Sequence, residues 1–486
     1  MTSTVPAGAA DGAGAPEPAA EPAVPEATPL LTPRDGVPPV VETAEALADV
    51  VARFAAGSGP VAVDAERASG YRYSQRAYLV QLRRSGAGTA LIDPIACPDL
   101  SGLSEALDGV EWVLHAASQD LACLAEVGLT PSRVFDTELG GRLAGLERVG
   151  LGAMVEGMLG LRLEKGHSAA DWSTRPLPEA WLVYAALDVE VLVELRDEIE
   201  ALLDRQGKLA WAHEEFEAVR LALPAPPRVD PWRRTSGMHR LRSRRQLAAV
   251  RALWQVRDGM ARRRDTAPGR ILPDAAIVSA VAAAPATPSA LLELPVFGGR
   301  ATRRHVDTWF GALQSATTLP ESELPQPLPP GDGPPAANRW AERDPVAARR
   351  LARVRAVVTA LAEQHGMPPE DLVQPDAVRR LAWQPPAMSA GSAAVEAVSA
   401  ALQGHGARPW QVALVAPGLA GALPDPAPRP DPAPDPTAQA QPTAQAEPTA
   451  QAEPTAQADP TAQPEPTPRG RAAAPSFLEP PVPPER

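Results

Sequence analysis

The pattern of hydrophobic and polar positions first stands out around residue 64. Residues 61–63 form a short apolar run that follows Gly59-Pro60 and ends at two acids, Asp64 and Glu66. A run of this length, bounded by glycine and proline, predicts a buried strand. Side chains two positions apart leave the same face of a strand, so both carboxylates should point together from its end.

This pair of acids has two interpretations. Two carboxylates about 4 Å apart repel by about 4 kcal/mol at an effective dielectric constant of 20. A divalent cation with oxygen ligands is a common way to offset that repulsion. Alternatively, Asp64 and Glu66 lie at a strand end that is exposed to solvent. Further carboxylates elsewhere in the sequence must decide between a metal site and a solvated strand end.

More strands and helices surround this strand. Residues 77–82 and 89–92 predict two strands joined by a turn, and residues 112–115 predict a fourth. A helix is predicted over residues 43–56. Strands that alternate with helices are typical of an α/β domain, which we expect over residues 37–222.

Two further acids follow at positions that need an explanation. Asp120 stands in the first turns of the helix after the fourth strand, where the helix macrodipole favours an acid. Asp188 lies four residues after Tyr184 on a long helix, so the hydroxyl and the carboxylate share one face. An acid beside the apolar stripe of that helix is costly unless it is paired or bound to a metal. The alternative puts Asp188 on a wet helix edge, with Tyr184 as a half-buried core ring.

The second half of the chain has helical periodicity. Apolar residues recur at helical spacing over residues 239–318 and again over residues 344–418, which predicts two small helical domains. Pro-rich linkers at residues 223–238 and 319–343 separate the three folded parts.

Both ends of the chain have a composition typical of disorder. Residues 1–36 are rich in Ala, Pro and Glu, and residues 419–486 contain Pro-Thr-Ala-Gln five times, so we expect two disordered tails. Residues 1–30 and 424–466 carry eleven acids and one arginine, so these two segments account for −10 of the formal net charge of −13. The folded part is therefore close to neutral, and the acidic balance does not exclude nucleic acid as a partner.

The charge inverts at the start of the first helical domain. Residues 231–265 contain eleven arginines and two aspartates. Clustered arginine in an acidic chain favours phosphate binding, although a charged run can also be a solvated helix face. The arginines expected to contact nucleic acid are Arg240, Arg242, Arg244, Arg245, Arg262, Arg263 and Arg264.

Composition also narrows the compartment. Only Cys97 and Cys123 are present, and they do not form a C-x-x-C pair, which argues against a disulfide framework and a thiolate zinc site. No secretory signal is visible, and no apolar run approaches the roughly 20 residues that span a bilayer. We therefore expect a cytoplasmic protein without membrane contact, and the sequence indicates no obligate protein partner.

Three segments in order along the chain resemble the exonuclease motifs of the DEDD superfamily, in its tyrosine-bearing (DEDDy) branch. They are residues 63–66 (VDAE), 114–120 (LHAASQD) and 184–188 (YAALD). Residues 171–177 (DWSTRPL) are similar to a segment typical of ribonuclease D. One departure is Arg67, where ribonuclease D often has an aromatic residue.

The helical domains extend this resemblance. Residues 239–318 resemble an HRDC domain, a nucleic-acid-binding module found in ribonuclease D, and residues 344–418 resemble a diverged second copy. The resemblance implies a ribonuclease-H-like α/β exonuclease domain, with a mixed sheet flanked by helices. One or two small all-α bundles of HRDC type would follow it.

The resemblance also implies the chemistry. Asp64, Glu66, Asp120 and Asp188 would hold two divalent ions, Mg²⁺ or Mn²⁺, and Tyr184 would orient the attacking water. Two metal ions about 3.5–4 Å apart can stabilise both the attacking and the leaving oxygen of a phosphoryl displacement. The expected substrate is RNA with a free 3′ end, such as a tRNA precursor.

Some assignments stay open at this point. His115, Trp172 and Arg175 are weaker candidates for substrate contact, and for His115 the structural interpretation is preferred. A 3′–5′ exonuclease acting on DNA is one alternative, because carboxylate chemistry does not read the 2′-hydroxyl. A non-catalytic nucleic-acid-binding scaffold is another, although all five motif side chains are present.

Overall fold

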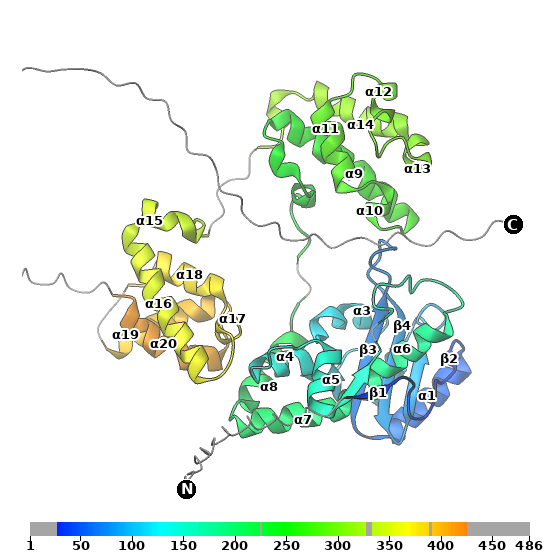
Figure 1. Ribbon diagram of the computed structural model, residues 1–486, viewed down its shortest axis with the longest axis vertical. Coiled ribbons are helices and arrows are strands. Elements are labelled where there is room, and N and C mark those ends of the chain that lie inside the picture. The colour runs from blue at the N-terminus through cyan, green and yellow to red at the C-terminus, as the bar shows by residue number, and fades with distance from the viewer. Residues whose placement is uncertain (1–26, 165, 224–225, 327–332, 388–390, 425–486) are drawn as a thin grey trace, which may run out of the picture. The chain divides into compact units, whose positions relative to one another are not determined.

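A computed structural model describes residues 27–424, except 165, 224–225, 327–332 and 388–390 (Figure 1). Most of both predicted tails therefore lies outside the described residues. Among the described residues, no helix has the length and apolar character of a membrane span.

The first part of the chain forms a six-stranded mixed sheet with the order β2-β5-β4-β3-β6-β7 (Figure 1). Its strands are β2 (Val40–Val41), β3 (Ser58–Arg67), β4 (Ala77–Ser85), β5 (Gly88–Ile92), β6 (Glu111–Leu114) and β7 (Arg133–Asp136). β3 runs antiparallel to β4 and parallel to β6. The predicted mixed sheet is confirmed.

Helices cover both faces of this sheet. They are α1 (Ala44–Ala56), α2 (Ser101–Ala106) and α3 (Leu121–Ala125) on one face, and α6 (Glu179–Glu190) and α7 (Leu192–Arg205) on the other. Along β3, Val61 and Val63 belong to the core beneath α1, whereas Ala62 packs against residues of α6 and α7. Asp64 and Glu66 continue the even-numbered series, so the strand directs both carboxylates toward α6.

Residues 27–36 belong to the fold, which corrects the predicted end of the N-terminal tail at residue 36. β1 (Thr28–Leu30) pairs in parallel with β8 (Leu161–Leu163). Three ion pairs follow β1, namely Arg34–Glu190, Arg34–Glu194 and Asp35–Arg83. The segment has few apolar side chains, so its composition resembles that of a tail. Backbone pairing and ion pairs with distant residues order it, and these contacts cannot be predicted from local composition.

Three further helices complete this part of the chain. They are α4 (Thr137–Leu143), α5 (Leu151–Leu159) and α8 (Leu209–Arg220). Asp136 is the N-cap residue of α4, and its side chain accepts a hydrogen bond from the backbone N–H of Leu139. This cap matters below, because Asp136 also contacts the turn that leads to Asp120.

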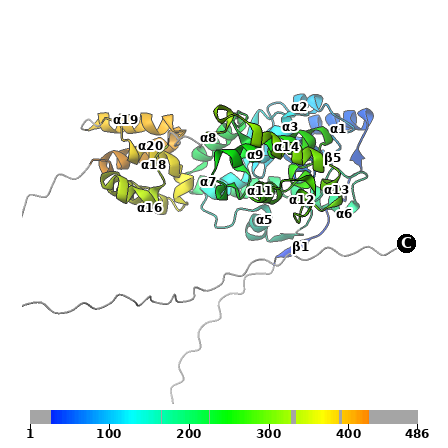
Figure 2. The ribbon, with the colours of Figure 1, turned by 90° about the horizontal axis from the view of Figure 1, so that it is seen from above.

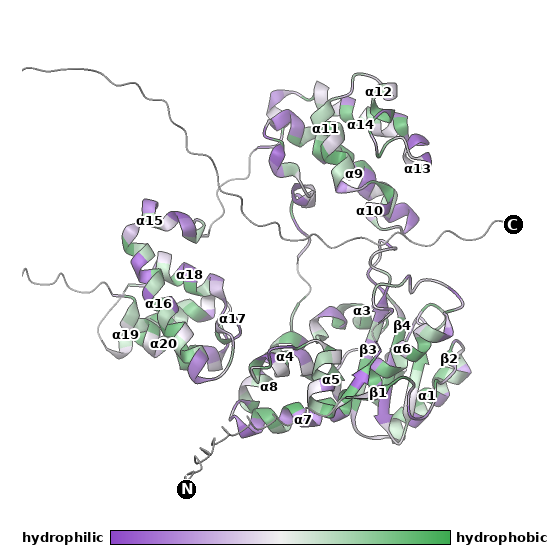
Figure 3. Cartoon of the chain, in the orientation of Figure 1, coloured by the Kyte–Doolittle hydropathy of each residue, from purple (hydrophilic) through white to green (hydrophobic). Residues whose placement is uncertain are grey.

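The first helical domain is organised around one long helix. Its elements are η2 (Pro231–Arg234), η3 (Met238–Arg240), α9 (Arg244–Arg264), α10 (Pro268–Ile271), α11 (Asp274–Ala283), α12 (Pro288–Leu292), α13 (Arg300–Arg303) and α14 (Val306–Thr318). A capping box between Ser243 and Gln246 starts α9. Leu253 of α9 shares a core with Ile277 and Trp309. Figure 3 shows hydrophilic stretches on α13, outside this core.

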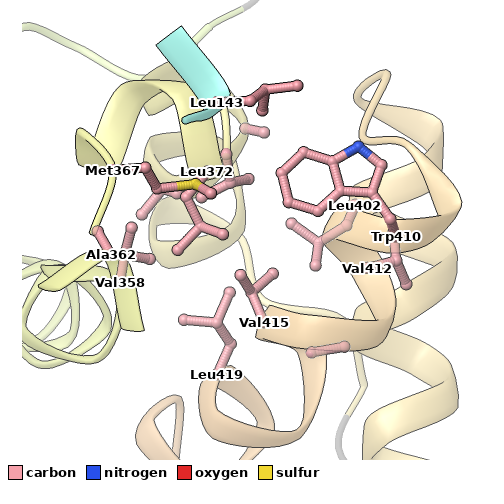
Figure 4. Packing of buried hydrophobic residues seen from close by; sticks show 14 of the residues in the cluster. Leu143, Val358, Ala362, Met367, Leu372, Leu402, Trp410, Val412, Val415 and Leu419 are labelled. Atoms are coloured by element: carbon pink, nitrogen blue, oxygen red, sulfur yellow. The ribbon is translucent and has the colours of Figure 1, made fainter. Parts of the chain in front are cut away.

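The second helical domain contains α15 (Trp340–Arg343), α16 (Pro345–Gln364), α17 (Pro369–Leu372), α18 (Pro375–Trp383), α19 (Ser392–Gly404) and α20 (Pro409–Ala422), which gather as one group in Figure 2. Figure 4 shows Val415 and Leu419 of α20 in the same buried cluster as Val358 of α16. The predicted C-terminal boundary at residue 418 is therefore too early, because buried side chains continue to Leu423.

Candidate active site

Three carboxylates meet at the C-terminal end of β3. Asp64 and Glu66 come from the strand, and Asp188 comes from α6, which covers the same face of the sheet. Each of the three offers a carboxylate oxygen within 4.8 Å of those of the other two. Groups this close cannot all ionise unless a cation compensates them.

Burial and mutual repulsion oppose full ionisation of this cluster. Burial, and then the charges of Asp64, Asp188 and Asp120, raise the pKa of Glu66 to about 10. Burial and the charge of Asp64 likewise raise the pKa of Asp188. A crowded set of hard oxygen donors with so little compensating charge fits divalent metal ions.

Asp120 stands beside this group of three without belonging to it. It follows the 3-10 turn η1 (Ala117–Gln119) and precedes α3. One carboxylate oxygen of Asp120, Oδ1, lies 3.5 Å from Nη2 of Arg67. Its charge still raises the pKa of Glu66, so the fourth acid lies near the cluster while paired with an arginine.

Tyr184 faces the same cavity, which has a volume of about 1040 Å³ and is lined by all five motif residues. Burial, and then the charges of Asp188 and Glu66, raise the pKa of the Tyr184 hydroxyl. The hydroxyl is therefore protonated at neutral pH. In this form it can donate a hydrogen bond to a water molecule or a phosphate, but it is not a phenolate base.

Sequence reasoning missed two buried side chains that support the site. Gln81 on β4 lies opposite Asp64 in the strand register, and its Nε2 donates to Oδ2 of Asp64 at 3.0 Å. Asp136 accepts hydrogen bonds from the backbone N–H groups of Ala116 and Ala117, at 3.1 and 2.9 Å. These bonds hold the turn before Asp120, where Ala116 has a φ of 61°. A glutamine inside an apolar strand was the available signal for Gln81.

The three weaker candidates make structural contacts. Trp172 is fully buried, and its indole donates to a backbone carbonyl. Nη2 of Arg175 lies 2.9 Å from Oδ1 of Asp93, in a bidentate ion pair. His115 lines the cavity, with Nδ1 2.9 Å from Oγ1 of Thr137. Burial lowers the pKa of His115 to about 4, so the ring is neutral at pH 7.

The arginines predicted to bind nucleic acid divide between the two ends of α9. Arg244 and Arg245 donate to backbone carbonyls in the segment 316–325, so they hold the end of α14. Arg245 and Arg263 are separated by about 27 Å along the helix axis. The seven side chains therefore do not form a single surface.

A different group of arginines gathers at the C-terminal end of α9. Nη2 of Arg264 lies 2.9 Å from Nε2 of His305, the N-cap residue of α14. This contact puts Arg264 beside the residue that follows the arginines of α13 and its C-cap, and we call Arg263, Arg264, Arg300, Arg303 and Arg304 the arginine cluster. All five are exposed, and no carboxylate of the described residues pairs with them. Sequence reasoning missed the α13 members because they lie outside the Arg-rich window.

Three protein-family models match three separate parts of the chain. Residues 38–204 match a family model described as 3'-5' exonuclease. Residues 246–313 match the HRDC domain. Residues 333–423 match a separate model, the 3' to 5' exonuclease C-terminal domain, where the sequence suggested a second HRDC copy.

Known proteins resemble most of the chain. Ribonuclease D of Acidiphilium cryptum (strain JF-5) is 36% identical over 313 residues, which cover 62% of this chain and 78% of that protein. Ribonuclease D of Escherichia coli (strain K12) is 33% identical, covering 55% and 72% of the two chains.

Two solved structures have a similar fold. The crystal structure of a protein from Bifidobacterium adolescentis matches with a TM-score of 0.76 and 38% identity, over 82% of this chain and all of that one. The structure of Escherichia coli RNase D, described as an exoribonuclease involved in structured RNA processing, matches with a TM-score of 0.57 and 27% identity, over 79% and 98% of the two chains. With its exonuclease and HRDC domains, the chain belongs to the ribonuclease D family of 3′–5′ exoribonucleases.

Proposed function

We propose that this protein removes nucleotides from the 3′ ends of structured RNA, such as tRNA precursors, with the help of two divalent metal ions, Mg²⁺ or Mn²⁺. The observation that carries the proposal is the convergence of Asp64, Glu66 and Asp188 in one cavity with Tyr184. Relatives named ribonuclease D support RNA as the substrate.

Each motif residue has a task in this proposal. Asp64, Glu66 and Asp188 hold the metal ions, and Asp120 completes the ligand set. When bound, the ions supply positive charge that stabilises the attacking and leaving oxygens of the displacement. Tyr184 positions the attacking water through its protonated hydroxyl.

Gln81 and Asp136 act through the ligands. The hydrogen bond from Gln81 restrains the Asp64 carboxylate in one orientation. Asp136 anchors the turn that presents Asp120. Such support reduces the reorganisation that is needed when metal and substrate arrive.

The arginine cluster at α9 and α13 supplies the second part of the proposed function, phosphate binding along the RNA. Its guanidinium groups have no carboxylate partner in the described part of the chain, so they can pair with phosphates without breaking an ion pair. Arg240 and Arg242, at the opposite end of α9, are exposed and remain further candidates.

A nuclease assay tests this function. Single-stranded RNA and DNA of matched sequence, labelled at the 5′ end, are incubated with the protein and Mg²⁺ or a chelator. We expect RNA to shorten progressively from its 3′ end, only with metal, while circular RNA and RNA with a 3′ phosphate resist. Cleavage of circular RNA at the same rate would indicate an endonuclease. Faster digestion of DNA than of RNA would identify DNA as the preferred substrate.

A further inference from the structure

We propose that Arg67 is a positioning residue that pairs with Asp120 and keeps it from its metal ion. A phosphate of the substrate then replaces the Asp120 carboxylate as the partner of Arg67. This inference rests on the proposed two-metal function. It assigns a task to Arg67, at a position where ribonuclease D often has an aromatic residue.

Arg67 is built into the active-site cavity. It follows Glu66 at the end of β3 and lines the cavity with the four acids. Its side chain is 26% exposed, whereas that of its partner Asp120 is 8% exposed. Its positive charge acts on Asp64, Glu66 and Asp120.

The ion pair divides the four acids into three and one. Asp64, Glu66 and Asp188 converge within 4.8 Å of one another, and Asp120 is absent from that group. The Asp120 carboxylate is 3.5 Å from the Arg67 guanidinium. One metal ion can therefore use ligands that already converge, whereas an ion that needs Asp120 must compete with Arg67 and is repelled by its charge.

A phosphate can release this competition. A guanidinium binds phosphate through two parallel hydrogen bonds, and phosphate carries charge into the same cavity. When Arg67 pairs with a phosphate, Asp120 becomes available as a ligand. Substrate and the second ion should then strengthen each other's binding, because such coupling is reciprocal. An aromatic side chain at this position, which has no charge, would not provide this coupling.

Calorimetric titration of Mn²⁺ into the full chain tests the proposal. The titration is done with and without adenosine 5′-monophosphate, which carries the phosphate of a released nucleotide. For the wild type we expect one tight ion, and a second that binds about tenfold or more weakly until the nucleotide is added. In Arg67→Gln the second ion should bind about tenfold more tightly without nucleotide and should no longer respond to it.

Two further variants separate charge from shape. Arg67→Lys keeps the charge, so its Mn²⁺ isotherm should stay close to that of the wild type. Arg148→Gln is the matched control, because Arg148 lines the same cavity, is exposed and has no carboxylate partner among the described residues. It should leave the Mn²⁺ isotherm of the nucleotide-free protein unchanged.

A measurement without metal gives an independent readout. In chelator, Asp120→Asn frees Arg67 and should tighten nucleotide binding several-fold, whereas Arg67→Gln should weaken it. Equal Mn²⁺ isotherms for wild type and Arg67→Gln, or a nucleotide affinity that neither variant changes, would overturn the role of Arg67. A wild type that binds no Mn²⁺ at all would overturn the proposed function itself.

Discussion

At the scale of single residues, the active site contains more acidic than basic side chains. Three acids converge and a fourth lies near them, while Arg67 is the cation whose charge reaches Asp64, Glu66 and Asp120. Buried carboxylates without full compensation destabilise a fold. The acids therefore serve ligand binding and not the stability of the fold. Substitutions of these acids should lower activity and raise the stability of the metal-free protein.

Asp188→Asn should lower turnover while it stabilises the metal-free protein. The amide removes a buried carboxyl group whose ionisation is opposed by burial and by the charge of Asp64, but it also removes a metal ligand. We expect turnover to fall by about 10²–10³-fold, the loss typical when one electrostatic group is removed. Nuclease rates and melting curves in chelator measure the two effects.

Asp197→Asn is the control, because Asp197 is an exposed acid on the neighbouring helix α7. It should change neither quantity appreciably. An Asp188→Asn variant with wild-type turnover would exclude Asp188 as a metal ligand.

Among the elements, α9 has arginines with different contacts at its two ends. Its N-terminal arginines Arg244 and Arg245 bind backbone carbonyls, whereas Arg264 at its C-terminal end contacts His305 and belongs to the arginine cluster. The helix is about 30 Å long, so its two ends are separate candidate surfaces for phosphate binding. The two ends can be tested separately.

The triple substitution Arg263→Gln, Arg303→Gln and Arg304→Gln should weaken RNA binding and reduce its salt dependence. Each lost phosphate contact should reduce the slope of log affinity against log salt by about 0.7 for single-stranded RNA. Binding isotherms at several salt concentrations measure this slope.

The double substitution Arg240→Gln and Arg242→Gln is the comparison at the other end of α9. A larger change in slope for this pair than for the triple variant would move the phosphate-binding surface to the N-terminal end of the helix. No change in either variant would leave both groups as solvated surface.

For the whole molecule, long-range contacts decide where the folded chain begins and ends. β1 pairs with β8, although about 130 residues separate them in the chain. At the other end, Leu419 and Leu423 are buried in the second helical domain. Chain ends chosen by composition alone cut through both features.

A chain of residues 27–424 should keep the melting temperature and the turnover of the full protein. A chain of residues 37–418 should be less stable by about 3 kcal/mol or more, because it lacks β1 and two buried leucines, each worth about 1.5–3 kcal/mol. Denaturant unfolding of both chains measures the difference. Equal stability of the two chains would show that these end contacts contribute nothing.

The stability of the whole molecule should also depend on pH and metal together. The folded-state pKa of Glu66 is raised from 4.5 to about 10, so the metal-free folded protein holds a proton that the unfolded chain has released. In chelator, stability contributed by this group should be present below about pH 4.5 and be lost as the pH rises toward about 10. Mn²⁺, which binds the ionised carboxylates, should stabilise most at high pH.

Melting temperatures between about pH 5 and pH 9, with chelator and with Mn²⁺, check this linkage. Glu66→Gln is the control, since it should flatten the decline in chelator and weaken the response to Mn²⁺. Parallel pH curves with and without metal would contradict a shared carboxylate site.

Local pattern by itself predicted the strands β3 to β6, and it identified the acids as candidates. An apolar run that ends at Asp64 and Glu66 predicts a strand with both carboxylates on one face, because side chains alternate with a period of two. The spacing of Tyr184 and Asp188 puts them on one helix face in the same way. These are properties of neighbouring residues, so the sequence expresses them directly.

Only the tertiary structure decided which side chains meet. Gln81 contacts Asp64 because β3 and β4 pair in one register, and Arg67 reaches Asp120 because β6 returns beside β3. The pairing of β1 with β8 orders a segment whose composition resembles a tail. Register and long-range pairing depend on the packing of the whole sheet, and periodicity along one segment indicates a face but not the partner that covers it.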